Sequence, residues 1–91
     1  MTDPARLACA GRLLLGPDWQ QPLARALGPL HPGGAREAID YRLVRRWASG
    51  ERPIPAWVWP TLAKLARERL AGARHDLTEL EAVASWTSAP A

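Results

Sequence analysis

The apolar residues of this chain recur at intervals of three or four, in short segments that glycines and prolines separate. This spacing is typical of amphipathic helices. The pattern predicts five helices, over residues 4–15, 19–27, 35–48, 56–71 and 77–86. We therefore expect an all-α fold, a compact bundle of about five short helices.

Capping residues and helix stops set the predicted boundaries of the first two helices. Asp3-Pro4 predicts the start of the first helix, because Asp is a good cap and Pro needs no donor at the first helical position. Asp18 is predicted to cap the second helix, which Gly28-Pro29 ends. Residues 28–34 hold three glycines and two prolines, and they predict a loop.

The third segment predicts a helix with one apolar face and one cationic face. The apolar face comprises Ile39, Leu43, Val44 and Trp47. The polar face comprises Tyr41, Arg42 and Arg45, with Arg46 at its edge. Asp40 falls within the apolar arc, which leaves a second possibility, that Asp40 is the cap and the helix starts there. We favour the longer helix, over residues 35–48.

The C-terminal third predicts two more helices after a stiff connector at residues 51–55. In the fourth helix, Pro60 favours a kink or a start near Trp59. The predicted buried residues of this helix are Val58, Leu62, Leu65, Ala66 and Leu70. Asp76 and Glu79 have the spacing of a capping box and predict the start of the fifth helix, over residues 77–86.

The chain has 91 residues, enough for a single domain, 1–91, with a modest core that we place at residues 4–72. A lone cysteine, Cys9, excludes an internal disulfide. The sequence has no apolar run of the ~20 residues that a bilayer needs, so we expect a cytoplasmic chain and no membrane partner.

The charge balance favours an anionic partner without requiring one. Twelve basic residues stand against nine acidic ones, which gives a net charge of +3 and an isoelectric point near 10. The two histidines lie far apart in the sequence and have no metal-ligand spacing with Cys9. We therefore expect no catalytic residues, no metal and no cofactor, and the chain is predicted not to be an enzyme.

Two stretches carry a family resemblance. Residues 23–28 read Leu-Ala-Arg-Ala-Leu-Gly, and residues 39–50 read Ile-Asp-Tyr-Arg-Leu-Val-Arg-Arg-Trp-Ala-Ser-Gly. In this order they resemble the helix-turn-helix of phage repressor and Cro-like (XRE-type) DNA-binding proteins, over about residues 18–70. One departure is the distance from Gly28 to Val44, which is about ten residues longer than in the family, so the turn is expected to be enlarged.

The resemblance implies roles for individual residues in binding double-stranded DNA. The residues that it implies as base contacts are Tyr41, Arg42 and Arg46. Gln20, at the start of the second helix, is implied as a phosphate contact. Gln21, Arg45 and Arg52 are expected to bind phosphates as well. The plain alternative is that these arginines form only a solvated helix face.

The function that the resemblance implies is a transcriptional regulator that represses by occupying an operator. One module makes few contacts, so we expect a homodimer on a palindromic site. Its predicted interface is the fifth helix, through Leu77, Leu80 and Trp86. The alternative is a small protein-interaction module on the same scaffold, such as a phage-type inhibitor or an antitoxin, which uses the long loop and the cationic face to bind an acidic protein.

Overall fold

The computed structural model describes residues 1–85 and is all-helical over this range. Its elements are α1 (Asp3–Leu15), α2 (Gln20–Leu27), the short 3₁₀ helix η1 (Gly28–Leu30), α3 (Tyr41–Ser49) and α4 (Val58–Ala84). The all-α prediction is confirmed. The prediction of five short helices is wrong, because four α-helices form and the last of them has 27 residues.

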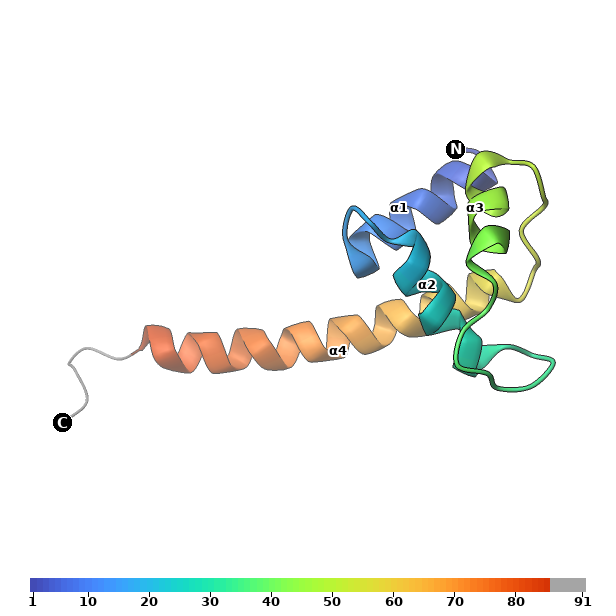
Figure 1. Ribbon diagram of the computed structural model, residues 1–91. Helices are drawn as coiled ribbons and strands as arrows, with labels where there is room; N and C mark the ends of the chain where they lie inside the picture. Colours follow the sequence, from blue (N-terminus) through green and yellow to red (C-terminus); the bar gives the residue numbers. More distant parts are fainter. Residues whose placement is uncertain (86–91) are drawn as a thin grey trace.

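The molecule is elongated, which contradicts the expected compact bundle. Helices α1, α2 and α3 gather around the N-terminal end of α4, and the rest of α4 projects away from them (Figure 1). The longest dimension is 58 Å, against 29 and 19 Å for the other two. We call α1, α2, α3 and residues 58–65 of α4 the head, and residues 66–84 the arm.

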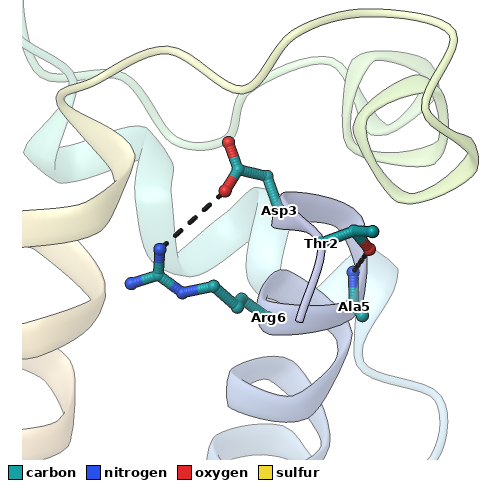
Figure 2. Close-up of polar contacts among 4 residues, drawn as sticks. All are labelled: Thr2, Asp3, Ala5 and Arg6. Carbon is teal, nitrogen blue, oxygen red and sulfur yellow. Dashed lines mark hydrogen bonds and ion pairs between the residues drawn. The ribbon is translucent and has the colours of Figure 1, made fainter.

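The N-terminal helix starts one residue earlier than predicted. The Oγ1 of Thr2 accepts a hydrogen bond of 3.3 Å from the backbone N–H of Ala5, so Thr2 rather than Asp3 is the cap (Figure 2). Asp3 instead lies in the first turn, where a carboxylate is favoured by the helix dipole, and pairs with Arg6 at 3.8 Å (Figure 2). The Arg6 guanidinium also lies 4.8 Å from the centre of the Trp59 ring, which joins α1 to α4.

One apolar core holds the head together. Its buried residues are Leu7, Trp19, Leu23, Ala24, Leu27, Ile39, Val44, Trp47, Val58 and Leu62. Trp47 is the largest fully buried side chain, and its ring meets the Trp57 ring edge-on at 6.4 Å between centroids. The core therefore takes residues from all four α-helices and from the turns before α2 and α3.

Trp19 precedes α2 and is buried, an arrangement that Gly11 makes possible. A Cβ atom at Gly11 would lie 2.4 Å from the Trp19 ring, so only glycine lets the indole lie against α1. Trp19 is the N-cap position of α2 and makes no side-chain capping bond. The prediction that Asp18 caps this helix is therefore wrong, because packing of the indole fixes the helix entry instead.

The fourth and fifth predicted helices form one continuous helix, α4. Pro60 is its third residue, where no intrahelical N–H donor is needed, so α4 starts at Val58 without a break. Asp76 lies in the interior of α4 and caps nothing. A single Gly72 costs only about 1 kcal/mol in a run of good helix formers, too little to end the helix. The prediction that Leu70 is buried is wrong: its side chain is 53% exposed, because the head ends near Leu65.

The third helix starts at Tyr41, so the predicted longer helix over residues 35–48 is wrong and the start at Asp40 is correct. Residues 35–38 are not helical because the chain there bonds back to the C-terminal end of α2 and to Gly28, which follows it. The N–H of Arg36 donates to the carbonyl of Gly28 at 3.1 Å, and the N–H of Ile39 donates to the carbonyl of Ala24 at 2.9 Å. We call these two bonds, with the contact of Gly28 against Ala38, the loop clip.

The loop clip depends on glycine at position 28. A Cβ atom there would lie 2.5 Å from the Cα of Ala38 and 2.7 Å from the carbonyl oxygen of Arg36. Both are backbone atoms, which cannot rotate away.

None of the helices in residues 1–85 is both long enough and apolar enough to cross a membrane.

We expect Gly28→Ala to lower the free energy of unfolding by about 1–3 kcal/mol, because the added methyl overpacks against backbone. Urea denaturation followed by circular dichroism measures this. The matched control is Gly72→Ala, since nothing lies within 4 Å of a Cβ atom there. The control should keep or raise helix content. A Gly28→Ala variant as stable as the parent protein would contradict the close approach.

Candidate nucleic-acid interface

Helix α3 presents a row of arginines to solvent. Val44 and Trp47 are buried against α1 and α2, with 0% and 1% of their surface exposed. Residues 42, 45 and 46, all arginines, lie on the opposite side and are exposed. The same helix therefore fixes the arginine side chains relative to the core, because its apolar face cannot turn away from the head.

Both ends of α3 are held by local hydrogen bonds. The Oδ1 of Asp40 accepts from the backbone N–H of Arg42 at 2.9 Å, which is an N-cap. At the other end Gly50 has φ +82°, a left-handed conformation that favours glycine, and its N–H donates to the carbonyl of Trp47. The N–H of Arg52 then donates to the carbonyl of Arg46 at 3.3 Å, so the connector turns back along the helix end.

The charges on this face remain accessible to a ligand. Arg42 lies 3.6 Å from the Asp40 carboxylate, but both side chains are more than half exposed, so water weakens the pair. Arg45 lies over the Tyr41 ring, 5.8 Å from its centre. Arg46 forms no ion pair within residues 1–85.

Two open grooves lie against α3. The larger, of about 560 Å³, is lined by Pro17, Asp18, Trp19, Gln20, Gln21 and Tyr41. It brings the start of α2 next to the start of α3. The smaller, of about 250 Å³, is lined by Arg42, Arg45, Arg46, Ser49 and Glu51. Together they form a polar surface that runs from α2 along the exposed side of α3.

The structure brings together most of the residues that the sequence singled out. Gln20, Gln21 and Tyr41 share the larger groove, and the three arginines of α3 share the smaller one. Arg52 is exposed just beyond the end of α3 and lines neither groove.

Sequence reasoning missed two groups of lining residues. Pro17, Asp18 and the edge of the buried Trp19 line the larger groove because the turn before α2 lies next to Tyr41 of α3, which no local pattern indicates. Ser49 and Glu51 lie close to the arginines in the sequence. Their position at the end of α3 was enough to predict that they border the arginine face. The Ser49 hydroxyl donates to the Arg46 carbonyl at 3.1 Å.

The long loop between α2 and α3 leaves the arginine face open. Its residues line neither groove. The His31 ring meets the Trp57 ring at 5.1 Å, and its Nδ1 accepts from the N–H of Gly33 at 2.9 Å. These contacts draw the loop toward the start of α4, beyond the N-terminal end of α3 (Figure 1).

The predicted dimer residues lie far from this surface. Leu77 and Leu80 are on the arm, 57% and 62% exposed. Trp86 lies outside the described residues. The arm and the arginine face are thus two separate surfaces of the molecule.

No family model, curated protein or solved structure matches this chain. Its functional interpretation therefore depends on the geometry and charge of the surfaces described above.

We expect Asp40→Ala to lower the free energy of unfolding by about 1 kcal/mol, because the N-cap of α3 is lost. Asp40→Asn is the matched control, since an amide oxygen can accept the same bond. Thermal and urea melts of the two variants give the comparison. If Asp40→Asn is destabilised as much as Asp40→Ala, the carboxylate charge and not the cap is what matters.

Proposed function

We propose that this protein is a sequence-specific regulator that binds double-stranded DNA through α2 and α3, used as a helix-turn-helix, and represses transcription by occupying an operator. The observation that carries the proposal is the exposed arginine face of α3 next to the start of α2. A helix with exposed arginines, held in a fixed orientation by a small head, suits the major groove of B-form DNA, which is wide enough for one α-helix.

The loop clip supports the assignment of a helix-turn-helix. Gly28 ends α2, and the chain returns to its side at Ala38. Only Ile39 and Asp40 then separate this point from the start of α3. The excursion over residues 29–37 therefore adds length to the chain without separating the two helices, whose connection is as short in space as a tight turn.

The chemistry of α3 suits the reading of base edges. An arginine can donate two hydrogen bonds to O6 and N7 of guanine, which identifies that base in the major groove. Arg42 and Arg46 are the proposed base contacts, together with Tyr41 at the N-terminal end of the helix. Exposure of both arginines lets each guanidinium reach a base without breaking a buried contact.

The surrounding polar groups suit contacts with the DNA backbone. The first backbone N–H groups of α2 have no intrahelical acceptor and favour an anion, and no side chain caps them. Gln20 and Gln21 lie at this helix start and are proposed to donate to phosphates. Arg45 and Arg52 flank the base-reading residues and are proposed to neutralise phosphates on either side.

Repression would follow from steric exclusion of the polymerase, in the cytoplasm, without a chemical step or a cofactor. Selection from a pool of random duplexes identifies the preferred site, and fluorescence anisotropy then measures affinity. We expect the logarithm of the affinity to fall linearly with the logarithm of the salt concentration, as phosphate contacts require. Recovery of a palindrome is the expected result.

We expect Arg42→Ala to lose about 1–3 kcal/mol of binding free energy at the selected site and to relax the preference at one base pair. Arg52→Ala should weaken all duplexes alike and lower the salt slope by about 1. Lys64→Ala removes the same charge from an exposed position on α4 and is the control, with little change expected.

The outcome that contradicts the assignment is equal behaviour of Arg42→Ala and Arg52→Ala. Equal, weak binding to every duplex would instead favour the protein-interaction module, in which the same cationic face binds an acidic protein.

A further inference from the structure

The arm of α4 carries an apolar seam, which the head leaves uncovered from Leu70 onward. The seam residues are Ala66, Leu70, Ala73, Leu77, Leu80 and Ala84. They alternate in steps of four and three, the spacing that keeps one side of a helix facing a partner helix. The three leucines of the seam are 53%, 57% and 62% exposed.

The arm has no tertiary support of its own. Every residue from 67 to 85 is exposed. A helix of this length without packing is marginally stable in water, because most helix stability in proteins comes from burying an apolar face. The seam lies on the same side of α4 as Leu62, which is buried in the head. One side of α4 is therefore apolar along the whole helix.

We propose that the arm pairs with the arm of a second copy of this chain, antiparallel, with the two-fold axis near residue 75. In this register Leu70 of one copy meets Leu80 of the other, and Ala73 meets Leu77. Each large residue faces either another leucine or a small alanine, which lets two helices approach closely. Ala66 meets Ala84 at the two ends of the seam.

The charges beside the seam favour the antiparallel arrangement. Arg67 of one copy then lies beside Glu81 of the other, twice in the dimer. The two Arg74 side chains meet on one flank of the axis and the two Asp76 side chains on the other. Antiparallel pairing thus gives two attractive contacts and two repulsive ones.

A parallel pair has only repulsive contacts at the corresponding positions. In a parallel pair, the residue just before one seam position lies beside a residue of the partner helix. That partner residue is the one just after the next seam position. Arg69 would face Arg74 twice, and Asp76 would face Glu81 twice. Within residues 1–85 neither Arg67 nor Glu81 forms an ion pair in its own chain, so both are available to a partner.

The pairing has a consequence for the proposed DNA binding, and only this consequence rests on that function. At about 1.5 Å of rise per residue, the two Leu62 positions lie about 40 Å apart along the helix axis. Successive major-groove faces are ~34 Å apart. The arm therefore acts as a spacer that sets two heads at a distance of the right order for two half-sites.

The first test is the dimer dissociation constant of the full chain without DNA, measured by sedimentation equilibrium with a reductant because Cys9 is exposed. Leu77→Glu should raise this constant by about 100-fold or more, since two buried leucines are lost per dimer. Thr78→Glu adds the same charge one residue away, off the seam, and should change it by less than about threefold. A monomeric parent protein, or equal effects of the two variants, would overturn the proposal.

The second test is the orientation of the two arms. In the antiparallel dimer, Arg67→Glu and Glu81→Arg each weaken pairing about fivefold to tenfold, although they change the net charge in opposite directions, and the double variant restores it. In a parallel dimer Glu81→Arg would relieve repulsion with Asp76 and strengthen pairing. A tighter Glu81→Arg dimer would therefore overturn the antiparallel assignment. If the monomeric Leu77→Glu variant still binds the selected duplex, arm pairing and DNA binding are separate properties of the chain.

Discussion

The loop clip is the constraint on which the arrangement of the head depends. The segment between α2 and α3, residues 28–40, is long enough to let the two helices lie far apart. Two backbone hydrogen bonds and the close contact of Gly28 with Ala38 return the chain to the end of α2. Because Ile39 is then buried beside Ala24, α3 must pack its apolar face on α2 and its arginines must face outward.

Local patterns predicted the elements that local physics determines. The two faces of α3 follow from residue spacing, and the Asp40 cap follows from its side-chain chemistry, although the longer helix predicted over residues 35–48 is wrong. That error has a tertiary cause. Residues 35–38 are reasonable helix formers, but the backbone N–H of Arg36 donates to Gly28, just after α2, and that of Ile39 donates to Ala24 of α2. These bonds depend on contacts distant in sequence.

The two ends of the chain show the same division. Asp76 and Glu79 form a valid capping pattern, yet a helix already running through Gly72 has no start there, so the pattern is not used. Burial of Trp19 required the absence of a side chain at Gly11, a pairing of two helices that spacing alone does not indicate. For the candidate site, the sequence placed the arginines on one face, and only the fold placed Gln20 and Gln21 beside Tyr41.

The two proposed roles, DNA binding and pairing with a second copy, belong to different parts of the chain, the head and the arm. The head holds the apolar core of the described residues, and this core fixes the orientation of α3. The arm has no core of its own and presents only a narrow seam. In the proposed assembly each part therefore supplies what the other lacks: the head a cationic surface for DNA, and the arm a contact between copies.

The most direct test of the DNA-binding account is an amide nuclear magnetic resonance titration of the full chain with the duplex that selection recovers. The account predicts that the largest shift changes fall on Gln20, Gln21 and residues 41–46, and that the amides of the arm change little. Changes concentrated elsewhere in the head, or none at saturating duplex, would contradict the assignment of α3 as the helix that reads DNA.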